Sequence, residues 1–331
     1  MTDFRLAQIK EWVTETLDVS EYELRPASSD ASFRRYFRVL VPGATHIVMD
    51  APPDKQGLQP FLTIGARLRA FGLQVPEVLD QDLVRGFLLL GDLGDQTYLQ
   101  VLNEANADRL YGDALGALRV LQHGGQSAPG FLPAYDASLL RRELGIFHEW
   151  YLGRHLSVML SARQRAALVQ AESVLMAAAL EQPKVWVHRD YHSRNLMLTT
   201  RNNPGILDFQ DAVYGPVTYD LVSLLRDCYI AWPQERLEVW LAQHQEAAHA
   251  MGLPVGRDRV QFRRWFDLMG AQRHLKAAGI FARLHHRDHK PGYLADIPRT
   301  LSYVWAVCRR YPELAGLGRL LDELEIPGVT A

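Results

Sequence analysis

The chain has 331 residues, of which 48% are hydrophobic and 22% are charged, so it can bury one large core or two modest ones. A net charge of −2 gives no overall attraction to nucleic acid or to an anionic membrane. Residues 1–17 lack the apolar region of a signal peptide, and no run reaches the roughly 18 apolar residues that cross a bilayer. We therefore expect a cytoplasmic protein, in which Cys228 and Cys308 are buried thiols rather than a disulfide.

The first part of the chain has the pattern of a small β-rich unit with helices. Apolar residues at helical spacing predict an opening helix over residues 4–17. Two apolar runs, 36–41 and 46–49, flank a Pro-Gly turn and predict a hairpin. A helix over 59–71 and a short buried strand over 87–90 complete this unit.

Beyond about residue 92 the chain is predicted to be mostly helical. Two short apolar strands, 185–187 and 206–209, interrupt this region. The pattern therefore predicts an α+β protein with domains 1–92 and 93–331. The predicted helices cover residues 107–122, 137–152, 161–180, 217–230, 235–251, 258–284 and 296–309.

The segment around the two short strands carries the most informative motif. Asp190 follows His188-Arg189, Asn195 stands five positions later, and Asp208 opens an Asp-Phe-Gln triplet. Phosphoryl transfer needs a carboxylate that receives a hydroxyl proton and oxygen ligands for magnesium. Turn residues alone would explain any one of these elements, but their joint spacing beside apolar strands favours a kinase site. Asp190 is then the candidate base, with Asn195 and Asp208 as magnesium ligands and His188 as an orienting residue.

These residues, together with Gly215-Pro216 and Tyr219-Asp220-Leu221, resemble the catalytic and metal-binding segments of the aminoglycoside phosphotransferase superfamily. The resemblance covers nearly the whole chain. It implies a bilobal, protein-kinase-like α+β fold with a small nucleotide-binding N-lobe and a larger, mainly helical C-lobe. It also implies that Asp220 braces the catalytic loop.

Within that superfamily the chain is most similar to bacterial kinases that phosphorylate the anomeric hydroxyl of an amino sugar. That similarity implies ATP and Mg²⁺ as cofactors and N-acetylmuramate and N-acetylglucosamine as substrates. The products would be sugar 1-phosphates for peptidoglycan recycling, and neither nucleic acid nor a membrane is expected as a partner.

The nucleotide site departs from the superfamily pattern. Met49 stands where kinases of this fold usually carry lysine, and the predicted helix 59–71 holds no acid to pair with one. The phosphates would then be held by magnesium, by a serine-rich loop, and by Lys55 or an N-lobe arginine. The loop lacks a G-x-G-x-x-G pattern, so by itself it is a weak signal. The nucleotide-binding candidates are Ser28, Ser29, Ser32 and Arg34 for the phosphates and Leu90, Gly91 and Leu93 for adenine.

The segment that we expect to form one wall of the substrate site has more basic than acidic residues. Residues 257–290 hold nine Lys or Arg against three acidic residues, which disfavours a polycationic aminoglycoside and suits an anion. Arg273 falls on an otherwise apolar helix stripe, where it either binds a substrate carboxylate or forms an internal ion pair. The substrate candidates are Glu143, Phe147, Trp150, Asp211, Arg226 and Arg273.

Other functions remain open from the sequence. A kinase of another small alcohol or of an aminoglycoside would share the same catalytic motif. The missing lysine is also compatible with an inactive nucleotide-binding pseudokinase, although Asp190, Asn195 and Asp208 are all present. A protein kinase is disfavoured, because the chain after Asp208 runs almost directly into the predicted helix 217–230 and leaves no room for an activation loop.

Overall fold

The computed structural model describes residues 3–28, 34–55, 57–326 and 329 and has the expected α+β composition. The chain divides into two compact units. The first combines Met1–Gln96 with Met197–Gln210, and the second combines Thr97–Leu196 with Asp211–Ala331. Among the described residues, no helix has the length and apolar character to span a bilayer.

A five-stranded antiparallel sheet forms the centre of the first unit, with the strand order β1-β2-β3-β5-β4. The predicted hairpin is confirmed as β2 and β3, paired from Arg35↔Asp50 to Val41↔Ala44. The two edge strands were not predicted from the sequence. The strands are β1 (Glu23–Ser28), β2 (Arg35–Val41), β3 (Ala44–Asp50), β4 (Val78–Asp82) and β5 (Phe87–Gly91).

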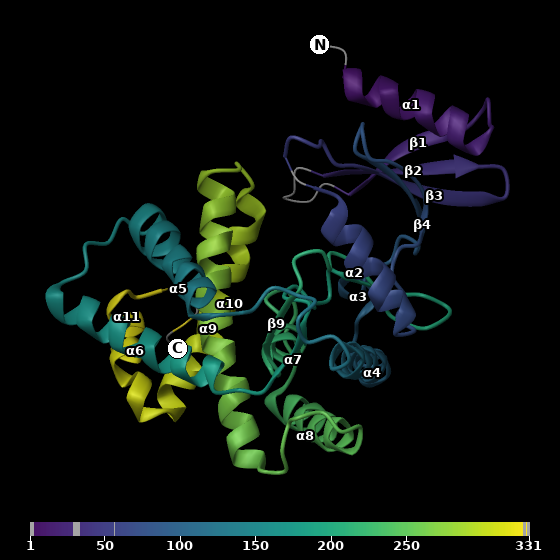
Figure 1. Ribbon diagram of the computed structural model, residues 1–331. Coiled ribbons are helices and arrows are strands. Elements are labelled where there is room, and N and C mark those ends of the chain that lie inside the picture. Colours follow the sequence, from purple (N-terminus) through teal and green to yellow (C-terminus); the bar gives the residue numbers. More distant parts are fainter. Residues whose placement is uncertain (1–2, 29–33, 56, 327–328, 330–331) are drawn as a thin grey trace. The chain divides into compact units, whose positions relative to one another are not determined.

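Helix α1 (Phe4–Leu17) covers one face of this sheet (Figure 1). The side chain of Asp3 accepts a hydrogen bond from the Leu6 amide at 3.1 Å and so caps the helix. Successive strand side chains point to opposite faces, so alternate residues share the core under α1. This core combines Ile9, Trp12 and Val13 of the helix with Val39, Val48, Phe87 and Leu89 of the sheet.

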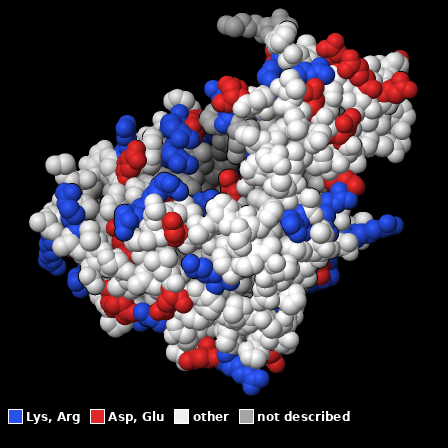
Figure 2. All heavy atoms as spheres, in the orientation of Figure 1, with Lys and Arg blue, Asp and Glu red and all other residues white. Residues whose placement is uncertain are grey.

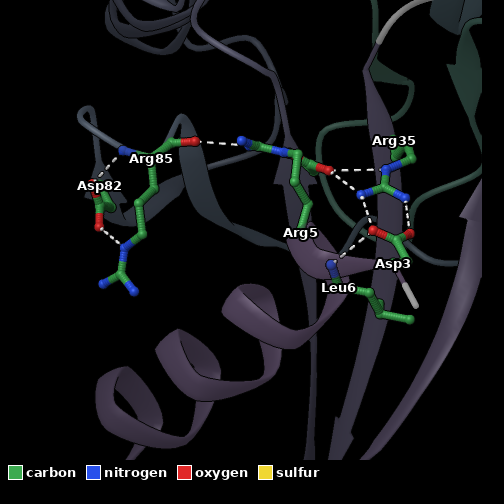
Figure 3. Close-up of polar contacts among 7 residues, drawn as sticks. Asp3, Arg5, Leu6, Arg35, Asp82 and Arg85 are labelled. Atoms are coloured by element: carbon green, nitrogen blue, oxygen red, sulfur yellow. Dashed lines mark hydrogen bonds and ion pairs between the residues drawn. The ribbon is translucent and has the colours of Figure 1, made fainter. Parts of the chain in front are cut away.

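A buried carboxylate ties α1 to the sheet. Asp50 follows Val48 by two positions, so it faces α1, and it is fully buried. Arg5 of α1 donates to one carboxylate oxygen of Asp50, and Arg35 of β2 donates to the other at 2.6 and 2.9 Å. Arg35 also pairs with Asp3, and Arg5 donates to the Arg85 carbonyl at 2.7 Å (Figure 3). Because both oxygens of Asp50 are bonded to guanidinium groups, its burial is compensated.

Helix α2 (Gln59–Ala70) lies on the other side of the sheet (Figure 1). Phe209 packs against it, with 4.9 Å between the ring centroids of Phe209 and Phe61. A Cβ on Gly65 would lie only 3.1 Å from the Phe209 ring, so the glycine permits this close approach. The predicted strand 206–209 is therefore too long: β8 spans only Gly205–Ile206, pairs with β7 (Leu196–Met197), and Phe209 packs on α2 instead.

The second unit is mainly helical, with α9 as its long central helix and α10 alongside it (Figure 1). The predicted helices are confirmed except in two places. The predicted helix 137–152 changes to π-helical turns at Phe147, and the predicted helix 217–230 already ends at Leu225. The main helices are α4 (Ala107–Gly125), α5 (Ala137–Ile146), η1 (Phe147–His155), α6 (Ala162–Leu180), α7 (Tyr219–Leu225), α8 (Gln234–Ala250), α9 (Arg259–His286), α10 (Ile297–Arg310) and α11 (Ala315–Glu323).

The core of the second unit is built around α9. A Cβ added to Gly279 would lie 2.6 Å from the carbonyl carbon and oxygen of Ile146, so only glycine allows α9 to approach the junction of α5 and η1 this closely. Phe147 lies in this core with both cysteines, which are buried and free as predicted. On the face seen in Figure 2, basic and acidic side chains are interspersed over a mostly uncharged surface.

Candidate active site

The catalytic loop of the second unit follows strand β6 (Lys184–Val187), which pairs with β9 (Val213–Pro216). The carboxylate of Asp220, at the start of α7, accepts hydrogen bonds from the amides of His188 at 2.6 Å and Arg189 at 2.9 Å. Arg189 has a φ of +79°, a conformation that a non-glycine residue adopts only when its surroundings enforce it. Burial raises the pKa of Asp220 to about 6, although the charge of His188 and the two amide bonds act in the opposite direction.

A second buried carboxylate, which the sequence did not single out, holds the other end of the loop. Asp227 accepts hydrogen bonds from the amides of Ser193 and Tyr229, each at 2.9 Å. Within the loop, the Asn195 side-chain amide donates to the Asp190 carbonyl at 3.0 Å. The Asp190 amide donates to Nδ1 of His188 at 3.3 Å. Carboxylates at both ends of α7 thus fix the backbone on which Asp190 and Asn195 stand.

Asp190 lies in a pocket of about 610 Å³ formed by α5, η1, α9 and the catalytic loop, all within the second unit. Four of the residues predicted from the sequence line this pocket: Asp190, Glu143, Trp150 and Asp211. A volume of this order suits a small ligand such as a monosaccharide. The remaining lining residues are Leu139, Arg142, Gly145, Ile146, Glu149, Arg189, Lys276, Ile280 and Arg283.

Glu143 is the centre of a charged cluster in the wall of the pocket. Its buried carboxylate accepts hydrogen bonds from Arg189 at 2.7 Å and from the Tyr135 hydroxyl at 2.5 Å, and it pairs with Lys276 at 3.0 Å. Burial alone would raise the pKa of Glu143. The charges of Lys276 and Arg189 and these hydrogen bonds outweigh burial and lower the pKa to about 2. Glu143 therefore acts as the counter-ion of two cations and has little capacity left to bind a sugar.

The same cations act on Asp190. Burial opposes ionisation of this half-buried carboxyl, but the positive charges nearby, of which Lys276 contributes most and Arg189 and Arg273 less, outweigh burial and lower its pKa. Asp190 is therefore a carboxylate at neutral pH and can accept a proton. Lys276 also donates to the Tyr219 hydroxyl at 3.0 Å, which holds its ammonium group beside the pocket.

Three of the predicted substrate residues do not line this pocket. Phe147 is fully buried in the helical core. Arg226 donates to the buried Asp267 at 2.8 Å, and that carboxylate also accepts hydrogen bonds from Arg263, Arg310 and Tyr311. Arg273 is 6% exposed and lies near Cys228, and neither its Nε nor its Nη1 has a hydrogen-bond partner in the described part of the chain.

The predicted magnesium ligands belong to different units: Asn195 to the second and Asp208 to the first. Asp208 adopts a φ of +63°, a left-handed conformation that is uncommon for aspartate. Its Oδ1 accepts a hydrogen bond from the Gln210 side chain at 2.6 Å, which fixes the carboxylate orientation within the first unit.

The predicted nucleotide residues fall in two stretches of the first unit, one around the end of β5 and one between β1 and β2. Leu90 belongs to β5 between β3 and β4, and the Gly91 amide donates to the Glu77 carbonyl at 2.8 Å. Leu93 follows Asp92, which pairs with Arg38 at 2.7 Å. The remaining candidates lie before β2: Ser28 ends β1, Arg34 is 4% exposed, and Ser29 and Ser32 are outside the described residues.

Strand β3 carries Met49 at the position where kinases of this fold usually have a lysine, and Met49 and its neighbour Asp50 point to opposite faces of the sheet. Met49 is fully buried and is paired with Tyr36 and Leu88 in the sheet, facing away from α1. The acidic neighbour Asp50 points to the other face, where it is neutralised by Arg5 and Arg35.

Lys276 is the most important pocket residue that sequence reasoning missed. The sequence signal was present, because Lys276, Ile280 and Arg283 follow the i, i+4, i+7 spacing of one helix face and all line the pocket. Arg273, chosen from the same basic segment, lies three residues before Lys276 and about 60° around the helix from it. That rotation places Arg273 in the protein interior rather than on the pocket wall.

The chain is similar to known proteins over most of its length. The model of the phosphotransferase enzyme family matches residues 23–263. An N-acetylmuramate/N-acetylglucosamine kinase of Pseudomonas putida is 50% identical over 98% of this chain and 97% of its own. One of the same name from Pseudomonas aeruginosa is 48% identical over 97% of both chains.

Solved structures show the same fold at low sequence identity. The choline kinase LicA from Streptococcus pneumoniae has a TM-score of 0.65 and 12% identity, covering 91% of this chain and 99% of its own. The ADP-bound aminoglycoside phosphotransferase APH(2'')-Ib has a TM-score of 0.59 and 16% identity, covering 90% and 97%. With the protein-kinase-like fold and the matched family segment, this chain belongs to the phosphotransferase enzyme family.

Proposed function

We propose that this protein transfers the γ-phosphoryl group of ATP to the anomeric hydroxyl of N-acetylmuramate and N-acetylglucosamine. The observation that carries the proposal is the pocket of about 610 Å³ in which the ionised Asp190 stands beside Trp150 and a set of fixed charges. The near-full-length identity to kinases of that name narrows the substrate class. Membership in a kinase family supports ATP as the phosphoryl donor.

Asp190 is the residue that receives the proton. The O–H bond of the anomeric hydroxyl breaks as its oxygen forms a bond to the γ-phosphorus, and the bond from that phosphorus to the β-γ bridging oxygen breaks to release ADP. The proton passes to the Asp190 carboxylate, which the neighbouring Lys276 and Arg189 keep ionised before the reaction. A hemiacetal hydroxyl is more acidic than an ordinary sugar alcohol, so a carboxylate is a sufficient base.

The donor groups at Asn195 and Asp208 fit magnesium. An amide oxygen and a carboxylate are the hard ligands that Mg²⁺ prefers, and two protein ligands suffice when phosphate oxygens and water complete the shell. Both side chains are held by hydrogen bonds, Asn195 to the Asp190 carbonyl and Asp208 to Gln210. Bound magnesium would neutralise phosphate charge, a task that falls more heavily on it because Met49 replaces the usual lysine.

The first unit would bind the nucleotide. We propose that the backbone around Leu90, Gly91 and Leu93 contacts adenine and that the segment containing Ser28, Ser29, Ser32 and Arg34 covers the phosphates. The protein would act in the cytoplasm, where its two free thiols remain reduced, and its sugar 1-phosphate products would return cell-wall sugars to synthesis.

The charges of the pocket argue against an aminoglycoside as the main substrate. Glu143 is already paired with Arg189 and Lys276, and Arg142 and Arg283 add further positive charge to the wall. The four acidic lining residues only equal the four basic ones in number, so the pocket lacks the excess of carboxylates that a polycationic ligand needs.

Phosphorus NMR of the product formed from N-acetylmuramate and ATP tests the proposal directly. An anomeric phosphate couples to H1 of the sugar, whereas a 6-phosphate couples to the two H6 protons. A 6-phosphate, or the absence of any sugar phosphate while another small alcohol is phosphorylated, would contradict the proposed reaction. The same assay with N-acetylglucosamine measures whether the lactyl group is required.

A further inference from the structure

Four cationic side chains line the pocket: Arg142, Arg189, Lys276 and Arg283. Two of them have a fixed partner, because Arg189 and Lys276 both pair with Glu143. In the part of the chain that the structure describes, neither Arg142 nor Arg283 forms an ion pair or a side-chain hydrogen bond. The pocket therefore presents two uncompensated guanidinium groups in addition to the catalytic carboxylate.

Arg283 is the more enclosed of these two groups. It is half-buried, and its Nε is buried without a hydrogen-bond partner among the described residues. A buried guanidinium nitrogen without a partner is unfavourable, so a ligand that accepts a hydrogen bond there would be stabilised. The nearby Asp288 accepts two hydrogen bonds from Arg287, at 2.8 and 3.0 Å, and forms no ion pair with Arg283. Burial and the charge of Arg287 lower the pKa of Arg283, which reflects its lack of a close counter-ion.

The position of Arg283 along α9 would let it contact a substituent on the side of a bound sugar that lies away from Asp190. Lys276, near Asp190, and Arg283 lie on the same helix face, and seven residues at 1.5 Å each separate them by roughly 10 Å. A sugar with its anomeric hydroxyl at Asp190 would therefore extend a ring and a short substituent toward Arg283. Arg142 reaches the same pocket from α5, which packs against α9.

We infer that Arg283, assisted by Arg142, binds the lactyl carboxylate of N-acetylmuramate and so sets the preference for this sugar over N-acetylglucosamine. The inference rests on the proposed function, since it assigns a specificity group within the same site. A guanidinium offers two parallel N–H donors to a carboxylate, and this pairing is both strong and geometrically selective. N-acetylglucosamine has a hydroxyl at that position and would leave the guanidinium of Arg283 without its anionic partner.

Two acidic residues in the pocket wall bear on this assignment. Glu149 and Asp211 are exposed, so solvent screens their repulsion of a substrate carboxylate. Glu149 lies close enough to act electrostatically on Arg283, yet the structure places no ion pair between them. The substrate carboxylate would thus be the closest anionic partner of Arg283.

Steady-state kinetics with three sugars test the inference: N-acetylmuramate, its lactyl methyl ester and N-acetylglucosamine. In Arg283→Gln we expect kcat/KM for N-acetylmuramate to fall about 10- to 100-fold, as for the loss of a charged hydrogen bond, while kcat/KM for N-acetylglucosamine changes less than about threefold. Arg283→Lys should keep part of the preference for N-acetylmuramate over N-acetylglucosamine. Arg142→Gln should lower this preference less than Arg283→Gln does. Arg165→Gln, an exposed arginine on α6 outside the pocket, is the matched control.

The outcomes separate this inference from the proposed function. Equal losses for both sugars in Arg283→Gln, or no loss for either, would overturn the carboxylate assignment while leaving the kinase reaction intact. A wild-type protein that phosphorylates neither sugar would refute the proposed function and the inference with it. If the variant does not fold, the wild-type enzyme decides: the methyl ester should be used no better than N-acetylglucosamine, and an ester as good as the acid would overturn the assignment.

Discussion

Replacing Glu143 by glutamine should destabilise the second unit in a way that depends on pH. The carboxylate is 2% exposed and compensates Arg189 and Lys276, so the neutral amide would leave the buried Lys276 and the partly buried Arg189 without the carboxylate that directly pairs with both. Removing one partner of a buried ion pair typically costs about 3–5 kcal/mol. The lowered pKa of Glu143 gives a second, similar value for the free energy that this carboxylate contributes to folding. The difference between the ordinary pKa of 4.5 and about 2, at about 1.4 kcal/mol per pH unit, corresponds to about 3 kcal/mol.

The sign of the pH dependence follows from the direction of the pKa change. Because the pKa of Glu143 is lower in the folded protein than in the unfolded chain, its contribution is complete above pH 4.5 and is lost as pH falls toward 2. Glu143→Gln has no such titration. The difference in unfolding free energy between wild type and variant should therefore be about 3 kcal/mol at pH 7 and shrink below about pH 4.5.

Urea unfolding followed by tryptophan fluorescence at several pH values measures this difference. Glu149→Gln is the matched control, because Glu149 lines the same pocket but is exposed and forms no ion pair in the described part of the chain. We expect the control to differ from wild type by less than about 0.5 kcal/mol at every pH. A Glu143→Gln effect below about 1 kcal/mol at neutral pH, or one independent of pH, would refute the assignment of Glu143 as the counter-ion of Arg189 and Lys276.

Three further predictions concern other carboxylates. Asp190→Asn should lower kcat by about 100-fold or more with ATP binding nearly unchanged by calorimetry, and more than a tenth of wild-type kcat would exclude Asp190 as the base. Asp220→Asn removes one of the two carboxylate oxygens that accept hydrogen bonds from the amides of His188 and Arg189. We expect kcat to fall and the unfolding free energy to fall by about 1–3 kcal/mol, and an unchanged kcat would contradict the role of Asp220 in bracing the catalytic loop. Asp50→Asn should weaken the attachment of α1 by about 3 kcal/mol, and unaltered hydrogen exchange in α1 would contradict this.

Strong local patterns explain which elements were predictable. Helices that bury one face, such as α4 and α10, repeat apolar residues at a spacing visible within a short window, so their positions were predicted to within a few residues. The edge strands β1 and β4 carry polar and charged residues and little apolar alternation. They are strands because β2 and β5 offer them hydrogen bonds, and their own sequences carry no comparable signal.

In the candidate site, too, the residues of a local motif were predictable from the sequence, whereas the residues defined by tertiary contacts were not. The spacing of Asp190, Asn195 and Asp208 identified the kinase motif because a catalytic loop is a short, contiguous piece of chain. Charge partners were not predictable in this way. Arg226 and Arg273 were both reasonable substrate ligands by residue type, yet the fold pairs Arg226 with Asp267 and buries Arg273 outside the pocket.

The sequence alone determined the α+β class, the chemistry of phosphoryl transfer and the residue offered as its base, because these depend on local periodicity and on a motif read along the chain. Only the tertiary structure decided that Glu143 neutralises Lys276 and Arg189, and that Arg142 and Arg283 line the pocket with no ion-pair partner among the described residues. Electrostatic energy depends on distance in space and on burial, and residues far apart in the sequence acquire both only when the chain folds.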